Sequence, residues 1–156
     1  MSMNESDAVF AALHDAARAA CGARLFTVTV LDRAAGVARR AYTSHPSDYP
    51  TSGTKQMQPN DWSAQVLEQG RSFVANSTAE FAPYFADHPL INALGCEAAM
   101  NIPVPDDAGQ VIATVNILDA AGHFTPARVS LLEALVAQHR AALLEAVAHV
   151  PMGAQP

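Results

Sequence analysis

Apolar and polar residues alternate in several short segments of the chain, which is typical of strands that bury one face. Leu25–Leu31 alternates and is rich in β-branched residues, and Val37–Thr43 follows it after a short turn. Ala98–Val104 and Val111–Leu118 are predicted to form a hairpin, and a short strand is expected in the segment 71–77. These patterns predict a sheet.

Helical spacing of apolar residues marks both ends of the chain. Ser6–Cys21 is predicted as a helix, with Ser6 as its N-terminal cap and Gly22 as its stop. A second helix is predicted from Thr125 and Pro126 to about His149. It carries one apolar stripe of Leu132, Leu135, Val136, Leu143 and Val147, and a second of Leu131, Ala134, Ala141 and Ala142. Covering a sheet needs only one stripe, so the second predicts contact with a partner.

The middle of the chain has no long periodic element. Ser44–Asp61 holds three prolines and is longer than the usual connection in a compact domain, so it is predicted to be a lid or, alternatively, a surface insertion. A short helix is expected from Asp61 to Gly70. Residues 78–95 are expected to form short helices, because Pro83 and Pro89 interrupt any long one.

The predicted hairpin sorts its side chains onto two different faces, because strand side chains alternate. In one register, the first face is wholly apolar and comprises Met100, Ile102, Val111, Ala113 and Val115. The same register gathers Asn101, Thr114 and Asn116 on the opposite face, and a slip by one residue would mix the two sets. The first strand sorts likewise, with Phe26, Val28 and Val30 opposite Thr27 and Thr29.

Short neutral polar groups on the mixed face suit an enclosed, partly polar cavity better than open solvent. A buried amide without a partner costs about 1–3 kcal/mol, so Asn101 and Asn116 need a backbone group, a water or a ligand. One hypothesis is therefore a ligand pocket on this face. The alternative is that the two amides fix neighbouring loops and bind no ligand.

Aromatic residues between Tyr49 and Phe85 are expected to roof this pocket. Trp62 would either pack in the core or form an aromatic wall for a flat ligand. The residues predicted to bind the ligand are Tyr42, Trp62, Phe81, Tyr84, Phe85, Asn101, Thr114 and Asn116. Because few charges are expected there, the predicted ligand is a small, neutral or weakly polar molecule.

Charge and hydropathy narrow the classes of partner. The formal net charge is -6, and the nine Lys and Arg residues form no run, which argues against nucleic acid and anionic membrane surfaces. No apolar run reaches membrane-spanning length and no signal peptide is evident, so a cytoplasmic protein is expected. Residues 1–150 are predicted to form one domain, followed by a disordered tail at 151–156.

Three segments together resemble the GAF domain family. "LGCEAAMNIPVPDDAGQVIATVNILD" is similar to its paired strands and turn, "HFTPARVSLLEALVAQHRAALLEA" to its closing helix, and "SAQVLEQGRSFVANS" to its middle helix and short strand. The sequence departs from the family pattern at Ala98, where Ser is frequent, at Ala113, where Gly is frequent, and at Asn76–Ser77, where Asp is usual.

The resemblance implies an α+β sensor domain. Its antiparallel sheet would carry the N- and C-terminal helices on one face and a ligand pocket on the other. GAF domains bind cyclic nucleotides, tetrapyrroles, haem or small metabolites, so the cofactor stays unknown. Many dimerise through their terminal helices, which would explain the second apolar stripe and implies a homodimer that signals through a partner.

Other readings of the resemblance stay open. The domain could be a dimeric scaffold that binds no ligand. It could also be an enzyme similar to the free methionine sulfoxide reductases, with Cys96 as the nucleophile. Cys96 is followed by Glu97 rather than His, which argues against a covalent bilin. His88 is the only candidate haem ligand, and His45 with Asp48 would make an incomplete metal site.

Overall fold

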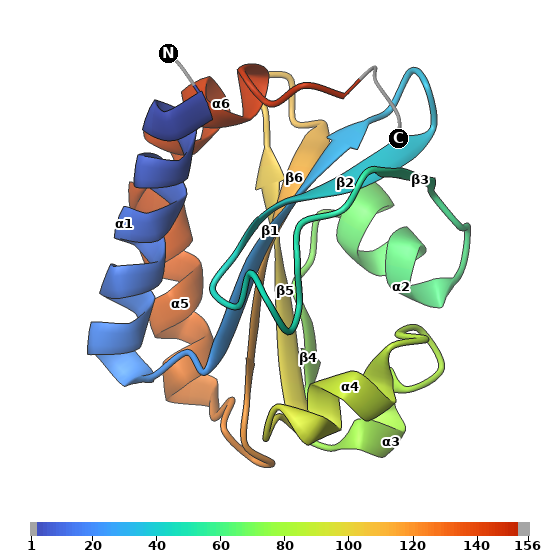
Figure 1. Ribbon diagram of the computed structural model, residues 1–156, viewed down its shortest axis with the longest axis vertical. Helices are drawn as coiled ribbons and strands as arrows, with labels where there is room; N and C mark the ends of the chain where they lie inside the picture. The colour runs from blue at the N-terminus through green and yellow to red at the C-terminus, as the bar shows by residue number, and fades with distance from the viewer. Residues whose placement is uncertain (1–2, 153–156) are drawn as a thin grey trace.

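The computed structural model describes residues 3–152. Its centre is a six-stranded antiparallel sheet with the strand order β3-β2-β1-β6-β5-β4 (Figure 1). The strands are β1 (Leu25–Asp32), β2 (Val37–Thr43), β3 (Thr54–Gln56), β4 (Phe73–Ala75), β5 (Ala98–Pro105) and β6 (Val111–Asp119). The predicted α+β class and the predicted long strands are confirmed.

Three helices from the two ends of the chain form a layer on one face of the sheet (Figure 1). They are α1 (Met3–Cys21), α5 (Pro126–Gln138) and α6 (Arg140–Ala148). The middle of the chain lies on the other side and contributes α2 (Asp61–Ser63), the π-helix η1 (Ala64–Glu68), α3 (Thr78–Phe81) and α4 (His88–Ala93). We call the two surfaces of the sheet the helix face and the cavity face.

The observed register sorts the strands as predicted. Met100 lies opposite Ile117, and Ile102 lies opposite Val115, so these four residues share the helix face. They join the largest buried cluster, which also includes Phe10 and other residues of α1, α5 and α6. Directly opposed residues share a face in an antiparallel pair, so the apolar set and the amide set stay separated along the paired strands.

A bulge near the end of the β5–β6 pair changes one predicted position. Val104 lies opposite Ala113, but the next pair is Pro105 with Val111, which leaves Ile112 as an extra residue in β6. A bulge shifts the alternation by one residue. Val111 is therefore on the cavity face, where it packs with Leu31 and Val66, and its predicted place on the helix face was wrong.

The structure corrects three predicted element boundaries. The final helix is divided at His139 into α5 and α6. The long loop contains the short strand β3, which pairs with β2. Helix α1 begins before Ser6, and the Ser6 hydroxyl does not cap it but donates a hydrogen bond of 3.1 Å to the Ala146 carbonyl in α6.

The C-terminal residues 151–156 were predicted to form a disordered tail. Residues 153–156 lie outside the described residues, whereas the Pro151 carbonyl accepts a hydrogen bond from Arg39. Within 3–152, no helix is both long and apolar enough to cross a membrane.

Candidate ligand-binding site

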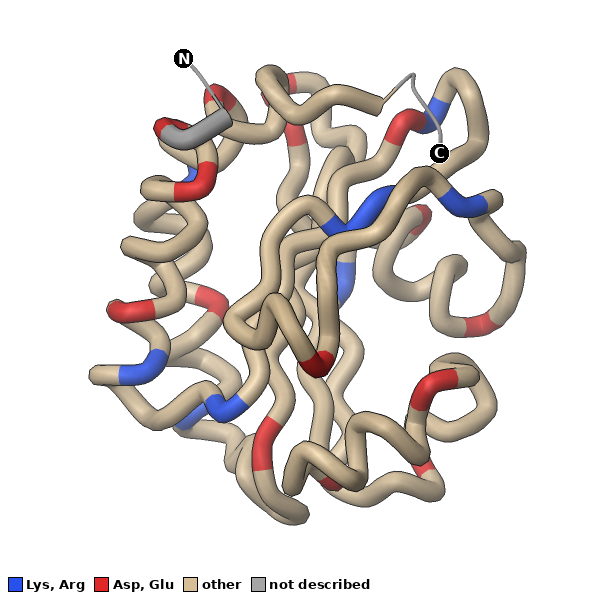
Figure 2. Tube along the Cα trace, in the orientation of Figure 1, with Lys and Arg blue, Asp and Glu red and all other residues tan. Residues whose placement is uncertain are grey.

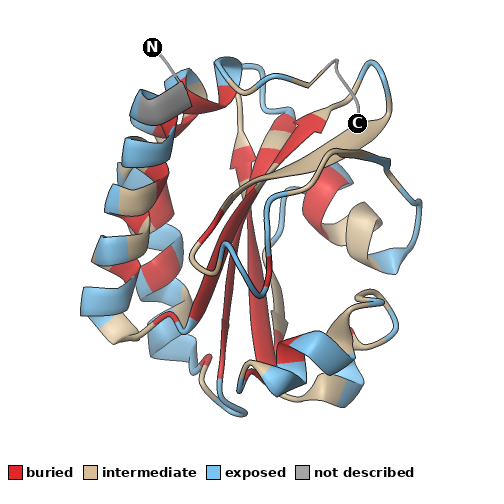
Figure 3. Ribbon diagram, viewed as in Figure 1, coloured by how far each residue is buried: buried red, intermediate tan, exposed pale blue. Residues whose placement is uncertain are grey.

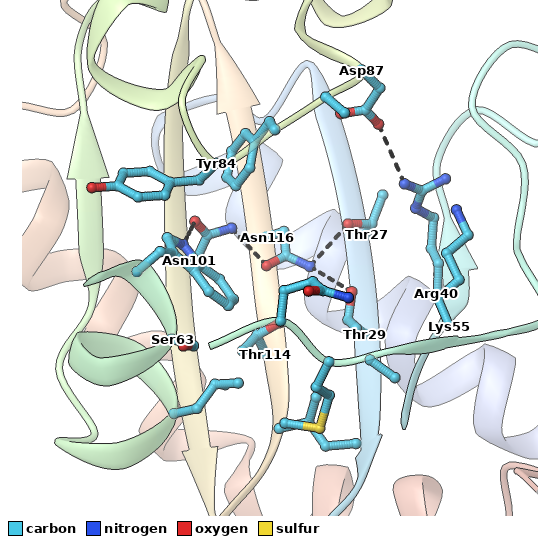
Figure 4. A pocket seen from close by; sticks show the side chains of 18 of the residues that line it. Thr27, Thr29, Arg40, Lys55, Ser63, Tyr84, Asp87, Asn101, Thr114 and Asn116 are labelled. Carbon is cyan, nitrogen blue, oxygen red and sulfur yellow. Dashed lines mark hydrogen bonds and ion pairs between the residues drawn. The ribbon is translucent and has the colours of Figure 1, made fainter. Parts of the chain in front are cut away.

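A cavity of about 520 Å³ lies on the cavity face, between β1, β5 and β6 and the middle segments of the chain (Figure 4). This volume is within the range of roughly 300–1,000 Å³ that is common for small-molecule sites. Its lining comprises Thr27, Thr29, Leu31, Ala38, Arg40, Tyr49, Lys55, Met57, Gln58, Trp62, Ser63, Leu67, Tyr84, Phe85, Ala86, Asp87, Ile91, Asn101, Thr114, Asn116 and Leu118. The strands supply its floor.

A chain of hydrogen bonds crosses this floor. The Trp62 indole N–H donates to Asn101 Oδ1 at 2.9 Å, and Asn101 Nδ2 donates to Asn116 Oδ1 at 2.8 Å. Asn116 Nδ2 then donates to the hydroxyls of Thr27 and Thr29, each at 3.1 Å. Both amides therefore have protein partners, so their burial does not by itself require a ligand.

The indole N–H of Trp62 fixes the direction of this chain, because an indole can only donate. Asn101 must present its oxygen to Trp62, so its NH₂ group faces Asn116. Asn116 in turn presents its NH₂ group to the two threonines, which accept. The hydroxyl protons of Thr27 and Thr29 are consequently left free to donate to another group.

Thr114 is the exception on the floor. It is 2% exposed and lines the cavity, yet its hydroxyl has no hydrogen-bond partner among residues 3–152. Its register is firm, since Thr114 lies opposite Thr29 on β1 and Pro103 on β5. A buried hydroxyl without a protein partner is costly, which makes Thr114 the most informative polar group of the cavity.

Charged groups lie at the side of the cavity formed by β2 and the long loop. The Arg40 guanidinium stacks on the Tyr49 ring at 3.7 Å and lies 3.6 Å from the Asp87 carboxylate. The Tyr49 hydroxyl donates a hydrogen bond to Asp87 as well. Burial is the main cause that raises the pKa of Tyr49, with the Asp87 hydrogen bond contributing in the same direction, so this hydroxyl stays protonated as a donor.

This cluster also holds the long loop in place. Tyr49 lies in the loop, Arg40 on β2 and Asp87 just before α4. Arg40 Nη1 adds a hydrogen bond of 2.9 Å to the Pro50 carbonyl, and Arg40 N donates to the Ser52 hydroxyl at 3.0 Å. The loop is therefore packed against the cavity, as expected of the predicted lid.

Aromatic side chains form the wall above the floor. Tyr84 and Phe85 line the cavity, and both pack edge to face against Phe73, with ring centroids 5.7 and 6.3 Å apart. Trp62 forms a further part of the lining and is held in one orientation by its bond to Asn101. The wall is therefore apolar and rigid, which suits a flat ligand.

The π-helix η1 borders a second hollow of about 440 Å³. This hollow shares part of its lining with the first: Met57, Gln58, Ser63 and Leu67. π-helical turns occur frequently near functional sites. The second hollow therefore adjoins the cavity and is bordered by residues of the long loop and of η1.

The structure brings together most of the predicted ligand-binding residues. The cavity is lined by Trp62, Tyr84, Phe85, Asn101, Thr114 and Asn116. Phe81 does not line it; this side chain is fully buried behind Phe85, at a centroid distance of 5.4 Å. Whether the lining residues bind a ligand stays a prediction.

Tyr42 was also predicted at the pocket, and this prediction was wrong. Its ring lies on the helix face, 5.9 Å from Phe10 and 6.0 Å from Phe26. The reason is a bulge in β2: Val28 lies opposite Tyr42, but Thr29 lies opposite Arg40, so Ala41 is extra. The bulge turns Tyr42 towards α1 and Arg40 towards the cavity.

Sequence reasoning missed the charged lining residues Arg40, Lys55 and Asp87. The expectation of few charges at the pocket was therefore wrong. Arg40 shares a face with Tyr42 in a regular strand, so the predicted place of Tyr42 already contained this signal, which was not used. Lys55 belongs to a strand too short to detect. Thr29 was placed on the mixed face but not among the ligand-binding residues, although the alternation pattern contains that signal.

The cysteines do not suit the enzyme alternative. Cys96 is fully buried among apolar residues and does not line the cavity, and burial raises its pKa to about 11. The reactive form of cysteine is the thiolate, which this environment disfavours at neutral pH. Cys21 lies at the end of α1, against the helix-face cluster.

The histidines offer little for a metal or haem. His88 lies at the start of α4 and does not line the cavity, and the ring of His45 is hydrogen-bonded to the Ser44 hydroxyl at 2.7 Å. Across residues 3–152, no group of three or more His, Cys, Asp or Glu side chains could hold a metal ion.

Comparison with known proteins places this geometry in a family. Residues 4–143 match the sequence profile described as GAF domain. No curated protein matches the sequence of this chain.

Solved structures show the same fold at low sequence identity. A GAF domain/HD domain protein from Geobacter sulfurreducens has a TM-score of 0.73 at 13% identity, covering 92% of this chain and 95% of that chain. The GAF domain of a two-component sensor histidine kinase from Bacillus halodurans has a TM-score of 0.69 at 12% identity, covering 89% and 93%. The second GAF domain of DevS from Mycobacterium smegmatis has a TM-score of 0.64 at 16% identity, covering 92% and 96%.

The sequence profile spans most of the chain, and the solved GAF domains share its fold. The chain belongs to the GAF domain family.

Proposed function

We propose that residues 1–150 form one sensor domain that binds a small, neutral or weakly polar molecule in the cavity and passes the signal to a partner. The observation that supports this most is a hollow of about 520 Å³ over a rigid polar floor, on the face opposite the helices. The floor amides are neutral and the wall is aromatic, which is typical of small-molecule sites. The sensor histidine kinase from Bacillus halodurans supports the signalling role by analogy.

Ligand-observed NMR with a small-fragment set would test the binding proposal, together with mass spectrometry of molecules that co-purify with the protein. The variant carrying Asn101→Leu and Asn116→Leu is expected to lose binding while its circular dichroism spectrum stays folded. Asn92→Leu is the matched control, because Asn92 bonds to Thr78 and the Cys96 carbonyl and does not line the cavity. Absence of any bound fragment and of any co-purified molecule would contradict the proposal.

The output is proposed to pass through a homodimer built by the terminal helices. The supporting observation is the second stripe of α5 and α6, which is exposed, with Leu131 45% exposed and Ala134, Ala141 and Ala142 beside it. The buried stripe on the same helices already covers the sheet. Exposed apolar stripes commonly mark protein contacts.

Light scattering would test the dimer. The wild-type chain is expected to have the mass of a dimer, and a variant carrying Leu131→Glu and Ala142→Glu the mass of a monomer. An unchanged mass in this variant would count against the helical interface. Leu90→Glu is the control, since Leu90 is equally exposed, at 41%, but lies on α4.

A further inference from the structure

One cross-strand row on the cavity face carries a cation and two hydroxyls, and neither hydroxyl donates to a protein group of residues 3–152. Arg40 of β2 lies opposite Thr29 of β1, Thr29 lies opposite Thr114 of β6, and Thr114 lies opposite Pro103 of β5. Directly opposed residues have Cβ atoms about 5 Å apart. We call Arg40, Thr29 and Thr114 the donor row.

The two hydroxyls of the donor row point to an oxygen acceptor. Thr29 accepts from Asn116, so its own O–H remains to be donated. Thr114 is buried and has no protein partner within the described part of the chain. Two adjacent hydroxyl donors in a cavity suit the two oxygens of a carboxylate, which accepts hydrogen bonds and donates none.

The charge around the donor row has the matching sign. Arg40 and Lys55 line the cavity together with a single carboxylate, that of Asp87. Asp87 is already engaged by Tyr49 and Arg40, whereas Lys55 makes no ion pair with any carboxylate of residues 3–152. One positive charge is therefore unbalanced at the cavity, and it would attract an anion.

The strand register directs Lys55 to this side of the sheet. Lys55 of β3 lies opposite Ala38, and Ala38 lies opposite Leu31, a residue of the cavity lining. Figure 4 shows the Lys55 and Arg40 side chains next to each other at the β2 side of the cavity. Figure 2 shows basic positions on β2 and β3. Of the basic residues of these strands, Arg40 and Lys55 line the cavity, whereas Arg39 lies opposite Val30 and faces the other side of the sheet.

We propose that the cavity binds a flat organic acid, with its carboxylate on the donor row beside Lys55 and its aromatic body against Trp62, Tyr84 and Phe85. This inference rests on the proposed ligand-binding function and revises its neutral or weakly polar ligand to one with a single acidic group, because charged side chains line the cavity. The rigid aromatic wall receives the apolar body, and the hydroxyls and cations receive the charge.

Three probes of nearly equal size isolate the charge of the ligand: benzoate, benzamide and benzylamine. Trp62 is the only tryptophan of the chain and lines the cavity, so its fluorescence reports binding directly. Benzoate is expected to bind about fivefold more tightly than benzamide, as for a partly exposed ion pair, and benzylamine is expected to bind most weakly. Equal or tighter binding of benzamide or benzylamine would overturn the inference.

Two substitutions then locate the carboxylate. Lys55→Gln is expected to remove most of the preference for benzoate over benzamide, whereas Arg71→Gln, which removes the same charge outside the cavity lining, is expected to keep it. Thr114→Val is expected to weaken benzoate binding by about fivefold or more, as for a lost hydrogen bond to a charged group. Thr54→Val is the control, because Thr54 lies opposite Arg39 and faces away from the cavity.

The two levels of the proposal fail differently. If other fragments bind the wild-type protein but benzoate does not, or if Lys55→Gln and Thr114→Val leave the benzoate affinity unchanged, the organic-acid inference is overturned while the sensor function stands. If no fragment of any charge binds, both are overturned.

Discussion

The two faces of the sheet differ in how tightly their side chains are covered by the rest of the chain. On the helix face, residues of β1, β5 and β6 pack with residues of α1, α5 and α6 in the largest buried cluster. Figure 3 shows buried positions along these strands and on the helices beside them. On the cavity face, the same strands present Thr27, Asn101, Thr114 and Asn116, and a hollow remains above them. Alternation along a strand thus lets one surface complete the core while the other borders a hollow.

The hydrogen bonds of buried polar groups also extend over different distances on the two faces. On the helix face, the buried Ser6 makes one bond, to Ala146 in α6. On the cavity face, the bonds run from Trp62 across β5 and β6 to β1. A network that crosses three strands fixes the orientation of the floor side chains. For the proposed ligand binding, this preorganisation would lower the entropic cost.

The largest effect is expected from emptying the helix face. Phe26→Ala should lower the free energy of unfolding by about 3–5 kcal/mol, because Phe26 is fully buried and the helices cannot collapse into the space. Phe85→Ala makes the same change on the cavity face, where the side chain is only partly buried and borders a hollow. Its cost should be clearly smaller. Urea unfolding followed by circular dichroism measures both.

Equal losses for Phe26→Ala and Phe85→Ala would contradict the comparison. They would mean that the aromatic wall of the cavity is part of the core that stabilises the fold.

A smaller loss is expected from breaking the floor network at its centre. Asn116→Leu removes the acceptor of Asn101 and the donor to Thr27 and Thr29, which leaves polar groups of a buried network without partners. The free energy of unfolding should fall by about 1–3 kcal/mol. The loss is measured by urea unfolding, and a stabilised Asn116→Leu protein would contradict the role of the network.

The alternation of apolar and polar residues was sufficient to predict the two faces. It placed Phe26, Val28 and Val30 on the helix face and Asn101 with Asn116 on the other, and the register confirms it. This worked because a slip by one residue would bury the amides beneath the helices. The sorted register avoids that cost. The same patterns gave the order of the main helices and strands, which the structure confirms, and the family resemblance is confirmed by the sequence profile.

Two side chains were assigned to the wrong face of the sheet for one physical reason. Tyr42 and Val111 were assigned to the wrong faces because a bulge adds one residue to β2 and another to β6. A bulge depends on how neighbouring strands twist and pair, which a single strand's sequence does not record. Arg40 was missed for a different reason: it lies two residues before Tyr42, so the predicted place of Tyr42 at the pocket already implied a cation beside it.

A substitution at Thr114 is the one change on the cavity face that is not expected to lower the free energy of unfolding. Thr114→Val keeps the size and the strand preference of the side chain but removes a buried hydroxyl without a protein partner. The free energy of unfolding should stay the same or rise by up to about 1 kcal/mol. Urea unfolding measures it, and Thr27→Val is the contrasting variant, because Thr27 accepts a hydrogen bond from Asn116 and its loss should destabilise.

A marked loss of stability in Thr114→Val would show that the hydroxyl serves the fold. A gain, combined with weaker ligand binding, would show that the cavity face retains a polar group for recognition at the expense of stability.

The smallest effect concerns a histidine that packs on the helix face. His14 of α1 stacks on Phe26 with centroids 4.9 Å apart. Burial is the main cause that lowers the pKa of His14 below 6.5, while a hydrogen bond with the Ala23 backbone opposes it and the Arg18 charge adds to it. The folded protein therefore binds a proton at His14 less readily than the unfolded chain does.

The sign of the pH dependence follows from this. As pH falls through 6.5, the unfolded chain takes up the proton first, so His14 makes the melting temperature fall; as pH rises above 6.5, this penalty disappears. In His14→Gln, the change in melting temperature between mildly acidic and neutral pH should be smaller than in the wild type. Thermal unfolding in matched buffers measures it. If His14→Gln leaves the pH dependence of the melting temperature unchanged, the buried position of His14 on the helix face does not lower stability at mildly acidic pH. The two faces would then differ less in their tolerance of charge than their packing indicates.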